Sequence, residues 1–229
     1  EDVLGSPFYV MERRRGLILR KKLPAGITID REMARCMSCA LIDNLAALHS
    51  IDYQAAGLSD MGKPEGYVER QVTGWIKRYG QARTSVVPAM DSVAKWLAAH
   101  MPPEAGASVI HNDYKYDNVM LNSDDFTKIV AVLDWEMATI GDPLMDLGTS
   151  LGYWVQSTDP VALQQAAFGP TALPGSLTRA ELVERYQEQT GVAVPDAVFY
   201  YSFGLFKLAV IVQQIYARFA RGTTKDPRF

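Results

Sequence analysis

The feature that most constrains this chain is a polar stretch, His-Asn-Asp-Tyr-Lys-Tyr-Asp-Asn at residues 111–118, enclosed by short apolar runs. Residues 109–110 precede it, residues 119–121 follow it, and a third run, residues 129–133, ends in Asp134. Apolar runs of this length between polar breaks predict strands. The order is therefore strand, polar loop, strand, turn, strand and acid, an arrangement in which strands hold a loop that carries chemistry.

Three side chains in this region suit one kind of chemistry. Asp113 is a candidate to orient or deprotonate a hydroxyl, and Asn118 and Asp134 offer the hard oxygen ligands that Mg²⁺ requires. Phosphoryl transfer depends mainly on positioning and charge neutralisation, so these three side chains are nearly all the groups that the reaction requires. The spacing, H-x-D-x-x-x-x-N followed by a later acid, is that of the kinase catalytic loop and the acid after it.

Three motifs in order carry a resemblance: His111-x-Asp113-x-x-x-x-Asn118, Leu133-Asp134-Trp135-Glu136 and Gly141-Asp142-Pro143-Leu144-x-Asp146-Leu147. Together they are similar to the catalytic centre of the aminoglycoside phosphotransferase family, within the protein-kinase-like superfamily. Asp-Trp-Glu stands where protein kinases usually carry Asp-Phe-Gly, which separates the small-molecule branch from the protein kinases. The resemblance implies ATP and Mg²⁺ as cofactors and a small-molecule hydroxyl as acceptor.

The resemblance also implies roles for the residues of the loop. Asp113 would orient the acceptor hydroxyl, and Asn118 and Asp134 would bind the metal. Lys115 lies two residues after Asp113, where protein kinases often carry a Lys facing the transferred phosphate; an exposed, solvated Lys is the other reading. His111 and Asp146 would support the loop structurally, Asp146 by accepting backbone N–H bonds from below.

Near the N-terminus, Phe8-Tyr9-Val10-Met11-Glu12 is a β-type run that resembles the hinge between the two lobes of a kinase-like fold. That position would place the adenine contact at Met11, Glu12 and Arg13, whereas an ordinary edge strand is the alternative. Residues 17–19 predict a second strand.

If residues 8–13 form the hinge, most of the N-terminal lobe is missing, because only seven residues precede Phe8. That lobe normally supplies the phosphate-covering loop and a Lys–Glu ion pair. We therefore expect a fragment rather than a naturally degenerate protein, with weak or no turnover by these 229 residues. The predicted fold is α+β and protein-kinase-like, with residues 1–20 a remnant of the N-terminal lobe and hinge and residues 21–229 a mainly helical C-terminal lobe with a few short strands.

Apolar periodicity and capping residues predict the helices of that lobe. Asp30 is a candidate N-cap, and Thr178 with Glu181 forms a capping-box sequence. The predicted helices cover residues 30–50, 64–80, 88–100, 143–154, 178–189 and 196–220, and residues 157–176 are predicted to be loop.

The two cysteines, Cys36 and Cys39, are spaced as in redox or metal motifs, but no second Cys or His pair accompanies them. Because they lie inside the first predicted helix, we expect plain helix residues, at least one of them packed in the core. Two cysteines fit a reducing cytoplasm.

Charge and hydropathy give no indication that the chain binds nucleic acid or a membrane. The formal net charge of −3 gives no electrostatic case for nucleic acid. No apolar run approaches the roughly 18–20 residues that span a bilayer, and no signal peptide is visible at the N-terminus. We therefore predict a cytoplasmic protein that binds neither nucleic acid nor membrane.

The sequence favours an ATP- and Mg²⁺-dependent phosphotransferase acting on a small-molecule hydroxyl. The hinge and loop are most similar to kinase-like domains associated with acyl-CoA dehydrogenases, which implies a hydroxyacyl-CoA-type acceptor. The alternative is a catalytically inactive kinase-like module that binds a nucleotide or a partner. The missing small lobe favours that alternative, and the complete set of Asp113, Asn118 and Asp134 disfavours it.

Overall fold

The computed structural model describes residues 5, 8 and 10–224. The helices are α1 Arg31–His49, α2 Tyr67–Ala82, α3 Pro88–Ala99, α4 Pro143–Tyr153, α5 Val161–Gln165, α6 Arg179–Thr190 and α7 Ala197–Ala220. The strands are β1 Ser108–Ile110, β2 Val119–Leu121, β3 Ile129–Val132 and β4 Thr139–Gly141. Three single 3-10 turns, Ser59–Met61, Tyr116–Asn118 and Trp135–Met137, complete the assignment.

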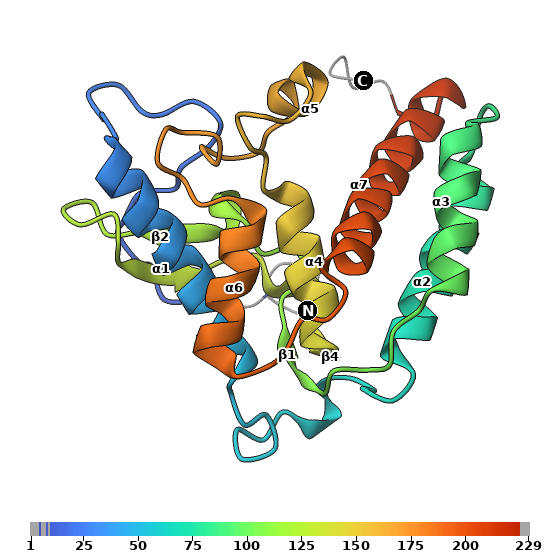
Figure 1. Ribbon diagram of the computed structural model, residues 1–229, viewed down its shortest axis with the longest axis horizontal. Helices are drawn as coiled ribbons and strands as arrows, with labels where there is room; N and C mark the ends of the chain where they lie inside the picture. Colours follow the sequence, from blue (N-terminus) through green and yellow to red (C-terminus); the bar gives the residue numbers. More distant parts are fainter. Residues whose placement is uncertain (1–4, 6–7, 9, 225–229) are drawn as a thin grey trace.

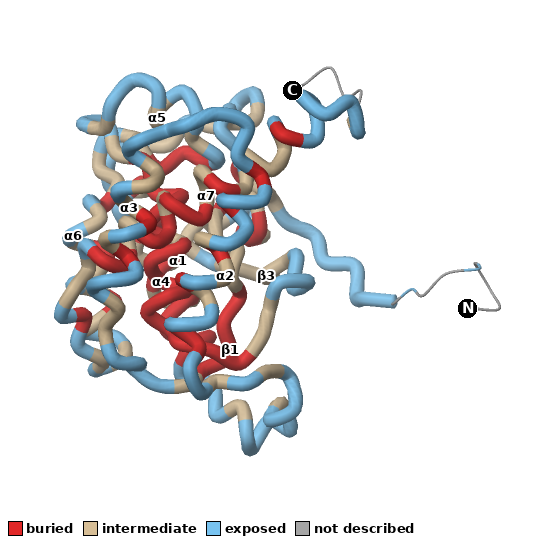
Figure 2. The backbone as a smooth tube through the Cα atoms, turned by 90° about the vertical axis from the view of Figure 1, so that its right-hand side faces the viewer, coloured by how far each residue is buried: buried red, intermediate tan, exposed pale blue. Residues whose placement is uncertain are grey.

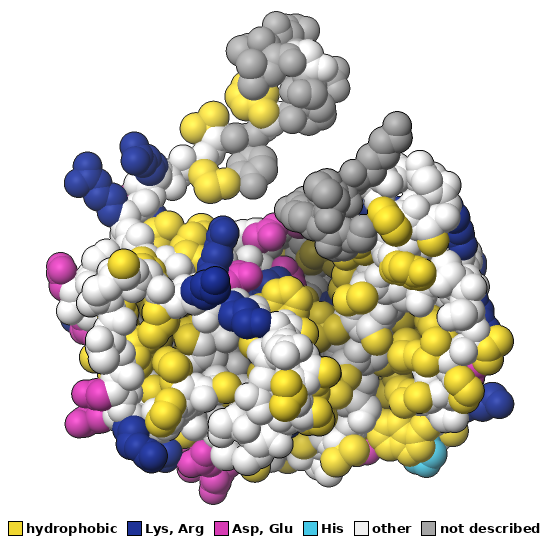
Figure 3. Space-filling model, turned by 90° about the horizontal axis from the view of Figure 1, so that it is seen from above, with side chains coloured by type: hydrophobic (Ala, Val, Ile, Leu, Met, Phe, Trp, Pro, Cys, Tyr) yellow, Lys and Arg dark blue, Asp and Glu magenta, His cyan; other side chains and the backbone are white. Residues whose placement is uncertain are grey.

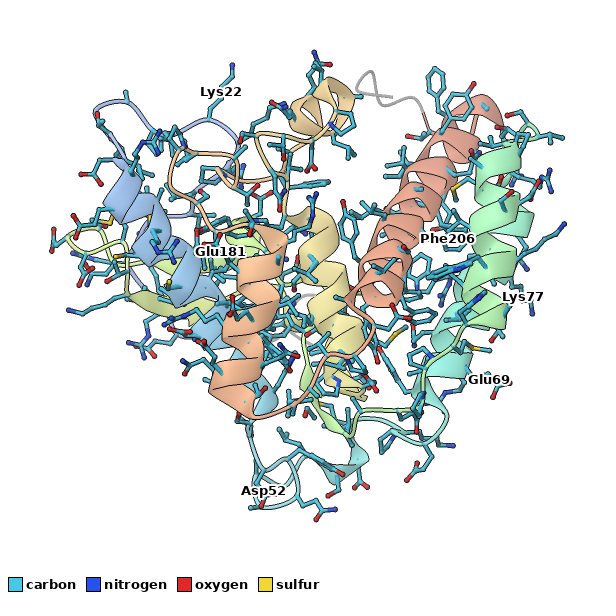
Figure 4. All side chains as sticks on the ribbon, viewed as in Figure 1. Lys22, Asp52, Glu69, Lys77, Glu181 and Phe206 are labelled. Atoms are coloured by element: carbon cyan, nitrogen blue, oxygen red, sulfur yellow. The ribbon has the colours of Figure 1, made fainter. Side chains whose placement is uncertain are left out.

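The helices pack side by side with α4 near the middle (Figure 1). On one side of α4 lie α6 and α1, which pack against each other, and on the other side lies α7. Helices α2 and α3 cover the outer side of α7, where Phe206 of α7 meets Tyr79 of α2 with ring centroids 6.1 Å apart (Figure 4). The buried backbone is concentrated in these central helices and in β1 (Figure 2).

Two small antiparallel sheets hold the polar stretch. Strand β1 pairs with β4, with Val109 opposite Ile140, and β2 pairs with β3, with Val119 opposite Val132. The loop that follows β1 therefore leads directly into the β2–β3 hairpin. Strand β4 was not predicted, because it has only three residues and no alternating pattern, and it depends on its pairing with β1.

The predicted helices are confirmed, with ends that differ by a few residues. Asp30 caps α1 by accepting the backbone N–H of Met33 at 2.8 Å. Thr178 and Glu181 form the predicted capping box of α6, whose C-cap Gly191 has a φ of +68°. These ends were readable from sequence because each cap acts within a few residues of its own helix.

Three sequence predictions are wrong in detail. The β-type run predicted at residues 8–12 forms no strand at residues 8 and 10–12, and Tyr9 lies outside the described residues. Residues 17–19, predicted as a second strand, contribute one bridge, Leu17 to Leu121. A strand needs a hydrogen-bonded neighbour, and residues 8 and 10–16 have none within the described part of the chain. The predicted loop 157–176 contains α5. The expectation that at least one cysteine packs in the core holds in part, because Cys39 is partly buried against the core while Cys36 is exposed.

Helix α7 is the long apolar helix predicted at residues 196–220. By length and composition alone it also resembles a membrane span. In this structure it packs against α4, α2 and α3, which bury Phe199, Tyr200 and Phe203. This packing agrees with the prediction of a buried helix.

Candidate active site

Asp113 lies at the centre of the site, held by three neighbouring side chains. Its Oδ1 accepts the Tyr153 hydroxyl at 2.5 Å. Its Oδ2 accepts Nζ of Lys115 at 2.5 Å and Nδ2 of Asn118 at 2.8 Å. A carboxylate offers about four accepting positions. Three are used by the described residues, so one position on Oδ1 remains for a further donor.

The hairpin brings Asn118 and Asp134 together. The backbone N–H of Leu133 donates to the Asn118 carbonyl at 2.8 Å, and Asp134 is the next residue along the chain. Asn118 also donates Nδ2 to the Asp113 carbonyl at 2.9 Å, which fixes the amide and leaves its Oδ1 as the free acceptor. The two predicted metal ligands therefore flank the paired strands, with Asn118 directly before β2 and in contact with Asp113, and Asp134 two residues after β3.

His111 ties the same hairpin to the loop. Its Nε2 donates to the Leu133 carbonyl at 2.8 Å, and its Nδ1 accepts the backbone N–H of Asp113 at 3.2 Å. A carbonyl only accepts and an amide N–H only donates, so this network requires the neutral ring with the proton on Nε2. Because both ring nitrogens are used inside the protein, His111 has no nitrogen free to take a proton from a substrate.

Asp146, in the first turn of α4, supports the loop from below. It is fully buried and accepts the backbone N–H groups of His111 at 2.7 Å and Asn112 at 2.8 Å. It also accepts Nε2 of His49 at 3.1 Å, and His49 Nδ1 lies 2.7 Å from the Tyr186 hydroxyl. Burial alone would raise the pKa of Asp146, but its hydrogen bond with His49 and the backbone N–H bond outweigh it and lower the pKa.

Asn112 and Asp134 are the non-glycine residues of the described chain with positive φ, 65° and 64°. Asn and Asp tolerate this left-handed conformation better than most residues. At Asn112 it turns the loop so that the next residue, Asp113, faces the site. At Asp134 it ends the β3 strand and leaves the carboxylate exposed, where a ligand can reach it.

The residues present fit a magnesium ion. Asn118 Oδ1 and the Asp134 carboxylate are hard oxygens without a hydrogen-bond partner among the described residues. Mg²⁺ is usually held by one or two protein oxygens together with phosphate oxygens and water. No group of three or more His, Cys, Asp or Glu side chains suited to a metal lies in the described part of the chain. The site therefore suits a metal that arrives with a phosphate ligand.

A cleft of about 980 Å³ opens beside Asp113. Hydrophobic side chains gather around a hollow on the face of the molecule seen in Figure 3. Among the described residues, Asp113 is the only acidic residue that lines the cleft, and Lys115 and Lys207 are the only basic ones. Apolar side chains make most of the rest of its wall, among them Val87, Met90, Val155, Leu163, Phe168, Leu205, Leu208, Ile211 and Ile215.

Lys115 belongs to the cleft rather than to the solvated surface. Its side chain is 14% exposed, and its Nζ lies 4.5 Å from the ring centre of Tyr153. The ring of Phe168 is 5.7 Å from the same atom. This placement excludes the reading of Lys115 as a freely solvated cation.

Sequence reasoning missed Lys207 and Tyr153. Lys207 was interpreted as a polar interruption of an apolar helix, yet it is 3% exposed and its Nζ donates to the Asn112 carbonyl at 2.8 Å. Burial lowers the pKa of Lys207 to about 8. A lysine in the middle of the most apolar helix was the available signal, whereas Tyr153 gave none.

The predicted adenine contact is separate from this cluster. Met11, Glu12 and Arg13 are exposed on the extended segment that leaves the body (Figure 2), and none of them lines the cleft. Glu12 pairs with Arg14 at 2.8 Å. Their role in binding adenine stays a prediction.

With this geometry in place, comparison with known proteins assigns the family. The model of the phosphotransferase enzyme family matches residues 1–182. The chain belongs to the phosphotransferase enzyme family. A crystal structure from Ralstonia eutropha JMP134, named as a candidate aminoglycoside phosphotransferase, shares 33% identity with a TM-score of 0.80 over 95% of this chain and 65% of that one. The macrolide 2'-phosphotransferase type I shares only the fold, at 16% identity and a TM-score of 0.60 over 93% of this chain and 64% of that one.

Other members of the phosphotransferase enzyme family are parts of longer proteins. Mouse acyl-CoA dehydrogenase family member 10 is 34% identical over 96% of this chain but only 20% of its own length. Human acyl-CoA dehydrogenase family member 11 is 34% identical over 98% of this chain and 29% of its own length. The chain thus spans less than a third of the length of these relatives. The solved structures confirm the predicted kinase-like fold with a mainly helical lobe.

Proposed function

We propose that the chain catalyses transfer of the γ-phosphoryl group of ATP to a hydroxyl of a small molecule, with Mg²⁺ as cofactor. The observation that carries the proposal is the Asp113 carboxylate, which faces a cleft and keeps one accepting position on Oδ1. An acceptor hydroxyl that donates to this position is oriented for attack. Lys115, Asn118 and Tyr153 hold the carboxylate in place.

Each residue of the site has a defined part in the proposal. Bound MgATP supplies the phosphoryl group, with Asn118 and Asp134 as the protein ligands of the metal. Asp113 would orient the acceptor hydroxyl and take its proton as the acceptor oxygen bonds to the γ-phosphorus and the bond from that phosphorus to the bridging oxygen breaks, which releases ADP. Lys115 lies beside Asp113 and offsets the negative charge that develops during transfer.

The cleft supports an acceptor with an apolar body. A polycationic aminoglycoside would require several acidic groups, and Asp113 is the only one that the described part of the chain places in the cleft wall. Glu181 lies on α6, on the opposite side of α4 from α7 (Figure 4), where it caps its helix and pairs with Arg35. We therefore favour a hydroxyacyl compound, as the family of the two dehydrogenase relatives suggests.

The test separates nucleotide binding from transfer. Titration of the chain with MgATP, measured by calorimetry, should show binding that Asp134→Asn weakens by at least tenfold, while the exposed Asp60→Asn leaves it unchanged. Formation of ADP is then followed in the full natural chain that contains this sequence, with aminoglycosides, choline, homoserine and hydroxyacyl-CoA compounds as acceptors.

The outcomes distinguish the proposed enzyme from a binding module. Acceptor-dependent ADP formation that Asp113→Asn lowers by about 10² to 10⁴ supports the proposal. MgATP binding without transfer to any acceptor supports an inactive nucleotide-binding module. Tight ATP binding that is indifferent to Mg²⁺ and to Asp134→Asn contradicts the assigned metal site.

A further inference from the structure

Lys207 is a buried cation that the proposed transfer step does not use. It lies in the middle of α7, lines the cleft and is 3% exposed. It forms no ion pair with a described residue: its one hydrogen bond goes to the uncharged Asn112 carbonyl, and its Nζ lies 5.7 Å from the ring centre of Trp75. Burying a charge is costly unless it is paired. An ammonium has three donors, so two remain beyond the bond to Asn112.

The wall around Lys207 gives the cleft a polar inner end and an apolar outer part. Ile211 and Ile215 follow Lys207 at steps of four on the same face of α7 and also line the cleft. Among the α7 residues that line the cleft, exposure rises from 3% at Lys207 to 64% at Val212 and 52% at Tyr216. The cation is therefore at the closed end, and the apolar side chains extend from it to the mouth.

The same inner end contains the proposed acceptor-orienting group. Asp113 lines the cleft, and Asn112, whose carbonyl Lys207 holds, is the residue before it. An acceptor whose hydroxyl reaches Asp113 brings its neighbouring atoms close to the two unused donors of Lys207. An oxygen at that point would give this cation the direct ion–dipole or ion-pair partner that it lacks among the described residues.

We propose that Lys207 is a specificity-determining residue that binds an acyl oxygen, either of a carboxylate or of a thioester carbonyl, on the acceptor whose hydroxyl Asp113 receives. The proposal rests on the proposed function for the identity of the acceptor hydroxyl. It predicts that an apolar alcohol without such an oxygen is a poor ligand. Burial lowers the pKa of Lys207 despite the opposing charges of Asp146 and Asp113, which agrees with a charge that has no ion pair among the described residues.

A purely structural Lys207 would act differently. If its only task is to hold the Asn112 carbonyl, its loss shifts Asp113 and affects all acceptors alike. Recognition of an acyl oxygen affects only acceptors that carry one. The ratio of affinities for matched ligands therefore separates the two roles.

The experiment measures binding without nucleotide, so it is independent of catalysis. The chain is titrated with a medium-chain hydroxy acid, its pantetheine thioester and the alcohol of equal length that lacks the acyl oxygen, with the hydroxyl placed from carbon 3 to carbon 6. Wild type is compared with Lys207→Met and with Leu208→Met, which changes an apolar side chain of the same cleft. Circular dichroism checks that each variant is folded.

Wild type should bind the acid or the thioester at least tenfold more tightly than the alcohol, and Lys207→Met should remove this preference. Loss for the acid alone indicates a carboxylate, and loss for both indicates a carbonyl oxygen. Leu208→Met should change the affinities for all three ligands by a similar factor. The proposal is overturned if wild type shows no preference, if it binds none of the three ligands, or if Lys207→Met weakens all three equally.

The proposal can be tested even if Lys207→Met does not fold, because it also requires that wild type bind the acid or the thioester more tightly than the alcohol. Failure of the proposed function would look different. The oxygen-dependent preference would persist while no ADP formed with any acceptor.

Discussion

The Tyr153 hydroxyl donates to Oδ1 of Asp113 at 2.5 Å, from the last residue of α4 to the loop that follows β1. Asp113 in turn raises the pKa of Tyr153, because burial and the nearby carboxylate both disfavour a phenolate. Tyr153 therefore stays protonated and orients the carboxylate through one fixed bond.

Replacing this hydroxyl tests the orientation of Asp113. Tyr153→Phe keeps the ring that packs against Phe168, with centroids 5.2 Å apart, but removes the donor. We expect phosphoryl transfer in the full natural chain to fall roughly tenfold, the loss of one hydrogen bond of a little over 1 kcal/mol, with MgATP binding unchanged. Tyr53→Phe, whose hydroxyl makes no described hydrogen bond, is the control. An unchanged rate would contradict the assigned role of Tyr153.

Asp146→Asn tests the support beneath the loop. The new amide would place NH₂ against backbone N–H groups that now donate to the carboxylate, so we expect a loss of roughly 2–5 kcal/mol in the free energy of unfolding. Urea denaturation followed by circular dichroism measures the loss. The exposed Asp60→Asn should change stability by less than about 0.5 kcal/mol. Equal effects of the two substitutions would refute the network.

The pH dependence of stability tests the burial of Lys207. Its pKa is about 8 in the folded protein and 10.5 ordinarily, so between these values the unfolded chain binds more protons. Stability contributed by this group therefore rises with pH across that window, by roughly 3 kcal/mol. The free energy of unfolding of wild type, compared with Lys207→Met, should increase from pH 7.5 to pH 10. Lys207 also feels the charges of nearby groups in this window, which are Asp146, Asp113, Lys115 and Arg78. If the free energy of unfolding changes with pH in the same way in wild type and Lys207→Met, the burial of Lys207 is contradicted.

The crossing of α4 and α7 tests a glycine that sequence left unexplained. A Cβ on Gly204 would meet the Gly148 carbonyl oxygen at 2.1 Å, so the two helices approach through glycines. Gly204→Ala gains up to about 1 kcal/mol of helix propensity, but overpacking should make it less stable by a net 1–3 kcal/mol.

Gly80→Ala is the matched control, because a Cβ on Gly80 of α2 has no neighbour within 4 Å. It should stabilise the protein by up to about 1 kcal/mol. Thermal or urea unfolding of the two variants gives opposite signs. Stabilisation by both would mean that α4 and α7 are not in close contact.

The features that could be predicted from the sequence are those fixed by residues close together in the chain. Asp30, Thr178 and Glu181 act on backbone groups within three residues, so the helix ends could be placed from the sequence. The spacing of Asp113 and Asn118 also fixes their proximity, because the turn between them is short. The polar loop 111–118, its candidate metal ligands and the order of the helices were therefore predictable.

The other parts of the site depend on contacts across the fold. Lys207 meets Asn112 across 95 residues and Tyr153 meets Asp113 across 40, so no pattern within either segment indicates the bond. The failed prediction of a strand at residues 8 and 10–12 has the same cause, since β-type residues form a strand only beside a partner. The sequence by itself determined the chemistry of the loop and the helices that surround it. Only the tertiary structure decided the apolar cleft and the buried cation inside it, because burial is set by which helices pack together.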